Sequence, residues 1–244
     1  MYSNNISVIK TELFQKNVNL VRLNLNGNKL NFVDEEHAAG VFENLKSLQE
    51  LSLRYNQISE LPAFKGLVGL VTLDVSYNKL TRPRASSYEV LKNLKYLKMT
   101  GNQILLEASF LKFSKSLRSM ALDNNQITKI EHSAFSELDN LGTLNLSHNN
   151  LTQLESKSFK GLTSLFDLDL SFNKIEKIDR KIFDNFKLLL KLDMRENRCA
   201  NDSSLWINNE KIDNLLSQCF SSSNVLKSSL VVLLVLSLIL IGFQ

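Results

Sequence analysis

Apolar residues along the chain recur in a fixed order that ends on an asparagine. One copy consists of Leu141, Leu144, Leu146 and Asn149, with polar or small residues between them. Residues two apart lie on the same side of an extended strand. The pattern therefore predicts one short strand per copy, with leucines inside and the intervening residues exposed. The copies repeat every 22 to 28 residues and close at Asn28, Asn56, Asn78, Asn102, Asn125, Asn149, Asn173 and Asn197.

The repeated asparagine needs a structural role. Where each strand turns inward, backbone N–H and C=O groups leave the sheet, and a buried group without a partner costs about 1–3 kcal/mol. An asparagine amide both donates and accepts hydrogen bonds, so stacked asparagines are expected to satisfy these groups from one copy to the next.

A second apolar column is predicted on the return side of each copy. It is formed by an aromatic residue, and its members are Phe14, Phe42, Phe64, Tyr88, Phe135, Phe159 and Phe183. The copy around Phe110 and Phe113 is irregular, and no residue of it is assigned to the column.

A unit of this kind cannot bury its own apolar face, so stacking must supply the core. The pattern resembles the "typical" class of leucine-rich repeats, common in animal extracellular proteins, over about residues 4 to 199. The resemblance implies an α/β leucine-rich-repeat solenoid, or horseshoe, with a parallel β-sheet on the concave face and irregular or short helical convex segments. A set of amphipathic helices is the alternative, and the fixed asparagine disfavours it.

The repeat array is assigned to residues 1–198, and the chain opens inside a repeat. Asn4, Ile6 and Phe14 occupy the positions that the asparagine, the following apolar residue and the aromatic occupy in later copies. No polar terminal cap and no secretion signal precede them, so we expect the array to be truncated at its N-terminus. A cytosolic protein that begins with an exposed half-repeat is the alternative.

The cysteines of the chain are Cys199 and Cys219, which follow the last repeat. Between them Leu205, Trp206 and Ile212 have helix-like spacing, which predicts a short helix. This segment, residues 199–220, resembles the cysteine-flanked C-terminal cap of extracellular leucine-rich repeats, although that cap commonly has four cysteines. The resemblance implies a Cys199–Cys219 disulfide. Two buried, reduced cysteines are the alternative, and the compartment decides between them.

The final residues, 221–244, are predicted to attach the array to the extracellular face of the plasma membrane. The uncharged run 230–243 would span about 21 Å as a helix, against a hydrocarbon core of about 30 Å, and no basic residue follows it. Ser221, Ser222 and Ser223, followed by a polar spacer and this run, resemble a glycosylphosphatidylinositol attachment signal. A single transmembrane helix is one alternative. A soluble protein with a buried final helix is another, which the apolar character of every face of the run disfavours.

Patterns for catalysis and metal binding are missing from the sequence. His37, His132 and His148 are far apart and lack metal-ligand spacing, and no common catalytic or phosphate-binding motif occurs. The net charge of +4 is spread without an arginine-rich cluster, so the chain does not favour nucleic acid. The sequence predicts a non-enzymatic protein without a cofactor or a nucleic-acid partner.

The exposed strand positions are the predicted working surface. In the early and middle copies they carry aromatic and basic residues, types enriched where proteins bind proteins. Tyr55 and Tyr77 also fall where the repeat family commonly has an aromatic residue, so the consensus is the favoured explanation for them. Arg54, Tyr96, Lys98 and Arg118 are less dictated by the repeat and are the first candidates. The candidate protein-binding residues are Arg54, Tyr55, Tyr77, Tyr96, Lys98 and Arg118.

Sequons for N-glycosylation occur at Asn5, Asn145, Asn150 and Asn201. A chain this rich in asparagine and serine supplies about that many by chance, so they do not establish secretion. Asn145 falls on the exposed sheet face, where a glycan would cover part of a binding surface.

Together these features predict a cell-surface adhesion or recognition module that binds a protein ligand through its concave face. In architecture it is similar to lipid-anchored animal adhesion proteins such as chaoptin and connectin. Two alternatives are the ectodomain of a Toll-like pattern-recognition receptor with a transmembrane helix, and a tail-anchored cytosolic scaffold.

Overall fold

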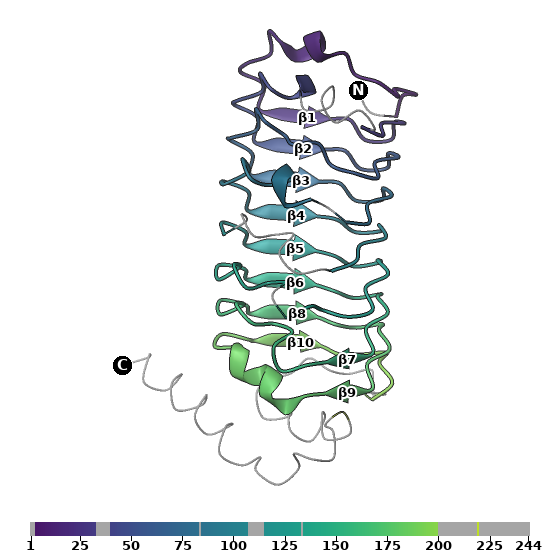
Figure 1. Cartoon of the computed structure of the whole chain (residues 1–244), viewed down its shortest axis with the longest axis vertical. Coiled ribbons are helices and arrows are strands. Elements are labelled where there is room, and N and C mark those ends of the chain that lie inside the picture. Colours follow the sequence, from purple (N-terminus) through teal and green to yellow (C-terminus); the bar gives the residue numbers. More distant parts are fainter. Residues whose placement is uncertain are drawn as a thin grey trace, which may run out of the picture.

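The computed structural model describes residues 3–32, 40–82, 84–106, 115–132 and 134–199, together with Cys219. Over these residues the chain is a solenoid whose short strands stack from one end of the molecule to the other (Figure 1). The strands form a parallel eight-stranded sheet in the order β1 (Arg22–Asn24), β2 (Glu50–Ser52), β3 (Thr72–Asp74), β4 (Tyr96–Lys98), β5 (Ser119–Ala121), β6 (Thr143–Asn145), β8 (Asp167–Asp169) and β10 (Lys191–Asp193). The predicted solenoid fold is confirmed.

The return side of the solenoid is mostly irregular. It contains the 3-10 helices η1 (Thr11–Phe14), η2 (Ala85–Ser87) and η3 (Arg180–Asn185). Near the C-terminal end, β7 (Gln153–Leu154) pairs in parallel with β9 (Lys177–Ile178) as a second, two-stranded sheet.

The register of the large sheet is the same at every step. The middle residue of each strand pairs with the middle residue of the next, as Leu23 does with Leu51 and Leu51 with Leu73. These middle residues are buried, whereas the strand residues on either side face outward and are at least partly exposed along most of the sheet. The leucines therefore point into the solenoid, as their alternation with polar residues predicts.

The aromatic column predicted on the return side is present. Its buried members are Phe14, Phe42, Phe64, Tyr88, Phe135 and Phe159. The rings of Phe42 and Phe64 lie 5.7 Å apart, and those of Phe135 and Phe159 lie 6.1 Å apart. The side chain of Phe183 and the irregular copy around Phe110 lie outside the described residues.

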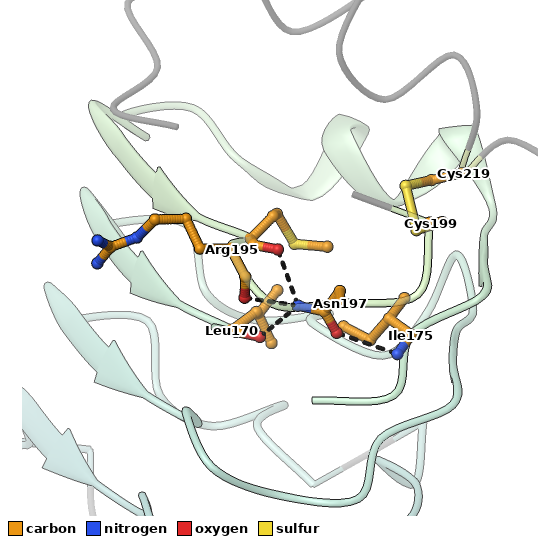
Figure 2. The surroundings of a disulfide bond; sticks show 7 residues. Leu170, Ile175, Arg195, Asn197, Cys199 and Cys219 are labelled. Carbon is orange, nitrogen blue, oxygen red and sulfur yellow. Dashed lines mark hydrogen bonds between the residues drawn. A yellow bond between two sulfur atoms is a disulfide. The ribbon is translucent and has the colours of Figure 1, made fainter. Parts of the chain in front are cut away.

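The predicted asparagine ladder is also present, and Asn197 shows its bonds (Figure 2). Its Nδ2 donates to the carbonyl of Leu170 in the preceding repeat and to that of Met194 in its own repeat, both at 2.9 Å. Its Oδ1 accepts the backbone N–H of Ile175 at 3.0 Å. The same three contacts recur at Asn56, Asn78, Asn102, Asn125, Asn149 and Asn173.

The residue before each ladder asparagine has a left-handed backbone. Its φ lies between 53° and 67° at Gly27, Tyr55, Tyr77, Gly101, Asn124, His148, Phe172 and Glu196. For residues other than glycine this conformation costs roughly 1–2 kcal/mol. It turns the chain inward after the strand, where the next residue joins the ladder.

The first described residues form the second half of a repeat, as the sequence pattern predicts. The N–H of Ile6 donates to Oδ1 of Asn28 at 3.1 Å, and the N–H of Ser3 donates to the carbonyl of Asn26. Ser3 has the same left-handed backbone, with a φ of 52°. Asn4 therefore stands at a ladder position.

At the other end, Cys199 takes the place of the isoleucine two residues after a ladder asparagine. Its N–H donates to the carbonyl of Ile175 at 3.0 Å, whereas in the preceding repeat the matching contact to Leu151 is made by Lys174, the residue directly after the ladder asparagine. The Cys199–Cys219 disulfide is formed (Figure 2). The carbonyl of Cys219 accepts the N–H of Ile178 in β9 at 2.8 Å, so the returning chain supplies a partner for the last strand of the small sheet.

The ladder should carry a large share of stability. Asn125→Ala removes the partner of the Ile104 N–H and of the Leu122 and Met99 carbonyls. We expect the free energy of unfolding, measured by urea denaturation followed by circular dichroism, to fall by about 3 kcal/mol. Gln126→Ala, at the exposed neighbouring position, is the control. Equal losses in the two variants would contradict a structural role for the amide.

The disulfide should stabilise the C-terminal end locally. Replacing both Cys199 and Cys219 with alanine opens a loop of 20 residues, which costs about 3 kcal/mol. Because each repeat contacts only its neighbours, hydrogen exchange measured by mass spectrometry should speed up in β8 and β10 and stay unchanged in β1 to β3. Equal acceleration along the whole sheet would show that the bond acts globally.

Candidate protein-binding face

The concave face is built from five outward positions in each repeat. They are the residue before the strand, the first and third strand residues, and the two residues that precede the ladder asparagine. In the repeat of β4 these are Lys95, Tyr96, Lys98, Thr100 and Gly101. Because the register is constant, each position forms a straight column across the sheet.

Arg54, Tyr55 and Tyr77 form one cluster at the carboxyl end of β2 and β3. The two tyrosine rings stack with centroids 4.6 Å apart. The guanidinium carbon of Arg54 lies 4.9 Å from the Tyr55 centroid and 4.7 Å from the Tyr77 centroid, within the range of a cation–π contact. Tyr55 is 52% exposed and Tyr77 is 36% exposed, so the stack is open to a partner.

Hydrogen bonds and charge hold the guanidinium of this cluster. Its Nη2 donates to the Tyr55 hydroxyl at 3.4 Å. Burial lowers the pKa of Arg54, but this hydrogen bond and the nearby Asp74 carboxylate outweigh it, so the pKa is raised above its ordinary value. Nε is buried and has no hydrogen-bond partner among the described residues. Arg54 therefore stays fully charged at the edge of the aromatic stack.

A glycine in the next repeat makes room for the stack. A Cβ on Gly101 would lie 2.7 Å from the Tyr77 ring, closer than a real contact allows. The ring of Tyr77 thus occupies the space that a side chain at position 101 would fill. A second such pairing occurs where the ring of Phe166 covers Gly142, with 2.5 Å to its hypothetical Cβ.

Tyr96, Lys98 and Arg118 lie on the next two strands. Tyr96 and Lys98 are the first and third residues of β4 and pair with Ser119 and Ala121 of β5, and Arg118 directly precedes β5. All three are exposed. Arg118 is at the amino end of its strand, opposite to the Arg54 cluster. The six predicted residues therefore share one half of the face without forming a single cluster.

The structure contains a second aromatic pair, which the sequence prediction does not include. The rings of His148 and Phe172 stack with centroids 4.3 Å apart, at the same position as Tyr55 and Tyr77 but further along the sheet. Phe166 and Leu190, at the amino ends of β8 and β10, are 45% and 67% exposed. The signal that could have found the pair is the aromatic residue at one column position in adjacent repeats.

Acidic residues gather on the later strands. They are Asp123, Asp167, Asp169, Asp193 and Glu196. Two of them pair with basic residues of the same region: Lys191 Nζ lies 3.1 Å from Asp167 Oδ2, and Arg195 Nε lies 3.0 Å from both oxygens of Asp193. The Asp193 hydrogen bonds and charge raise the pKa of Arg195.

In several repeats the third strand residue also has a structural role. At the third strand position, the side chains of Asp74, Asn145, Asp169 and Asp193 accept the backbone N–H two residues further on, at 2.9 to 3.1 Å. This is the local hydrogen bond that aspartate and asparagine commonly make in turns. It explains why the repeat favours these residues after the strand leucine.

The predicted glycosylation sites occupy different surroundings. Asn5 is exposed, and Asn150 is half-buried at the turn. Asn145 is half-buried in β6 between Ala121 and Asp169, and Asn201 lies outside the described residues. Glycosylation at each of them stays a prediction.

Metal-binding clusters and membrane-spanning helices do not occur in the described part of the chain. There, no group of three or more histidine, cysteine, aspartate or glutamate residues is placed to hold a metal ion. Nor does any helix among these residues have the length and apolarity to cross a bilayer. The proposed attachment serines, Ser221, Ser222 and Ser223, and the apolar tail lie outside the described residues.

Comparison with known families agrees with this architecture. The leucine rich repeat family model matches residues 2–58, 38–80 and 115–175, which is more than half of the chain, so the protein belongs to the leucine-rich-repeat family.

Among curated proteins, human lumican is 37% identical over 136 residues, which is 55% of this chain and 38% of lumican. Mouse epiphycan is 31% identical over 140 residues, which is 57% of this chain and 41% of epiphycan. The chain thus spans about two fifths of these two relatives.

Among solved structures, a complex of TLR13 with ssRNA13 superposes with a TM-score of 0.73 at 29% identity, covering 80% of this chain and 28% of that one. FLRT2, in an octameric complex with Latrophilin 3 and Unc5D, gives a TM-score of 0.71 at 22% identity, covering 81% of this chain and 60% of the matched one. The FLRT2 likeness shows the fold alone.

Proposed function

We propose that this protein is an extracellular recognition or adhesion module that binds another protein through the concave face. The observation that carries the proposal is the set of exposed aromatic and basic side chains on β2 to β5, from Arg54 to Arg118. Tyrosine buries a large area with little loss of rotamer freedom, and both tyrosine and arginine are enriched among the anchor residues of protein interfaces. The rigid ladder beneath holds them in place before a partner arrives.

A Toll-like receptor ectodomain is the second candidate. The likeness to TLR13, at 29% identity over 80% of this chain, favours it over the cytosolic scaffold, and the disulfide is also typical of extracellular proteins. An RNA ligand fits the face poorly. Stacked tyrosines can receive bases, but Asp123, Asp169 and Glu196 would repel the phosphates along the later strands.

The domain order predicted from the sequence is part of this proposal. Residues 1–198 form the array, 199–220 the cap and 221–244 the membrane-attachment tail. The lipid-anchor signal at Ser221 to Ser223 supports attachment at the cell surface, in the manner of chaoptin and connectin. This part of the proposal rests on the sequence alone.

Replacing three of the face residues together tests the binding proposal. The full-length chain is screened against a panel of purified extracellular proteins by surface plasmon resonance. We expect Tyr96→Ala with Lys98→Ala and Arg118→Ala to weaken binding of any partner found by at least about 30-fold, since anchor residues each contribute about 2 kcal/mol or more. The matched control is Lys65→Ala with Lys160→Ala, two exposed lysines that follow the aromatic column. Unchanged affinity in the triple variant would remove this patch from the interface.

Release from intact cells tests the proposed attachment. Cells that express the full-length chain are labelled at the surface and treated with a phosphatidylinositol-specific lipase. A lipid-anchored protein appears in the medium. Retention of the labelled protein would instead support a transmembrane helix, and a lack of surface labelling would support the cytosolic scaffold.

A further inference from the structure

The charges of the concave face are ordered along the solenoid. On β1 to β5 the basic residues Arg54, Lys95, Lys98 and Arg118 face outward, and the acidic residues there are Glu50 and Asp74. Glu50 is already paired with Arg22, whose Nε lies 2.9 Å from Oε1. The early half of the face is therefore positive.

The later half of the face has the opposite sign. From the turn after β5 onward the outward acidic residues are Asp123, Asp167, Asp169, Asp193 and Glu196. Lys191 and Arg195 are held by Asp167 and Asp193, which leaves Asp123, Asp169 and Glu196 to set the sign. Asp123 and Asp169 are already fixed by neighbouring side chains: Asp123 accepts the Thr100 hydroxyl at 2.8 Å, and Asp169 accepts the Ser171 hydroxyl at 2.7 Å.

Between the two halves the face carries short side chains. Ser119 and Ala121 of β5 lie beside Thr143 of β6, and the Thr143 hydroxyl donates to Oγ of Ser119 at 2.6 Å. None of these side chains is long enough to stop a bound chain from crossing from one half to the other. The two charged regions can therefore act on one ligand segment.

The distance between the regions gives the spacing that a ligand must match. In the sheet order β2, β3, β4, β5, β6, β8 there are five steps from the repeat of Arg54 to that of Asp169. At about 4.8 Å per step the separation is about 24 Å, and an extended chain covers that distance with about seven residues.

We propose that the partner presents an extended segment along the solenoid axis, with an acidic residue at the Arg54 cluster and a basic residue near Asp169, about seven positions apart. This inference rests on the proposed function, since it specifies the ligand of the same face. A carboxylate at Arg54 meets a planar guanidinium that the two tyrosine rings hold in place, which suits bidentate recognition. A basic side chain at the far end meets Asp169, and Asp123 adds negative charge along the way to it.

Selection from a random peptide library tests the proposal while the partner itself is unidentified. Peptides of about sixteen residues, roughly twice the required spacing, are displayed on phage and selected on the deglycosylated full-length chain in mild detergent. We expect the enriched peptides to share an acidic and a basic residue separated by about seven positions. Enriched peptides are then synthesised, and their affinities are measured by fluorescence anisotropy.

Charge-neutral variants assign each end of the peptide. Arg54→Met with Lys98→Met removes two of the four positive charges of one half, and Asp123→Asn with Asp169→Asn removes two of the three negative charges that set the sign of the other. Asparagine keeps the turn hydrogen bond, as Asn145 shows at the position of Asp169. Each pair should weaken binding by about tenfold or more, and the loss should shrink at high salt. The control pair Lys65→Met with Lys160→Met should leave the affinity unchanged.

The outcomes separate this inference from the proposed function. Peptides whose binding is lost in Tyr96→Ala but is unaffected by both charge-neutral pairs would overturn the charge order and keep the concave face as the binding site. Failure to enrich any peptide sensitive to a concave substitution would contradict both proposals. Salt-sensitive dimers in analytical ultracentrifugation, abolished by the same pairs, would assign the face to a second copy of this chain and overturn the proposed partner.

Discussion

The hydrogen bonds of the asparagine ladder are the interaction on which the rest of the structure depends. Each amide joins its own turn to the preceding one, as Asn197 does between Met194 and Leu170. Without it, the carbonyls at the end of each strand would be buried without partners, at about 1–3 kcal/mol each. The same bonds keep the register constant, because a shift by one residue would move the amide away from every carbonyl that it serves.

The ladder also determines what the surface can display. A left-handed residue precedes each asparagine, so wherever that residue is not glycine its side chain projects from the edge of the sheet. Where adjacent repeats have rings there, the rings stack, as Tyr55 does on Tyr77 and His148 on Phe172. The stacked edge is thus a consequence of the turn geometry and of residue choice at one position.

Much of this architecture could be predicted from the sequence because it follows from a period. The strands, the ladder, the aromatic column and the half-repeat at Asn4 each follow from residue type at a fixed spacing. The small sheet of β7 and β9 could not be predicted, because the second half of the repeat has no alternation that distinguishes two-residue strands from irregular chain.

The candidate site was only partly predictable, for a different reason. The columns place Arg54, Tyr55 and Tyr77 on one side of the sheet, but the contact of the guanidinium with both rings depends on side-chain rotamers in two repeats, and spacing carries no information on rotamers.

The exposed residues differ in how much the fold explains them. Stacking contributes about 0.5–1.5 kcal/mol beyond burial, which offsets part of the cost of about 1–2 kcal/mol for a left-handed tyrosine. Tyr55 and Tyr77 thus have a structural reason to be aromatic, and Asp74 has one to be acidic, because it holds a turn. Lys98 has no comparable reason, since it stands at the position where other repeats place the turn-forming aspartate or asparagine. Choosing lysine there gives up a local hydrogen bond and leaves a positive charge on the open face. A sequence selected for stability alone would favour aspartate or asparagine at that point, so Lys98 is the residue whose presence the ladder and the turn explain least and a binding role explains best.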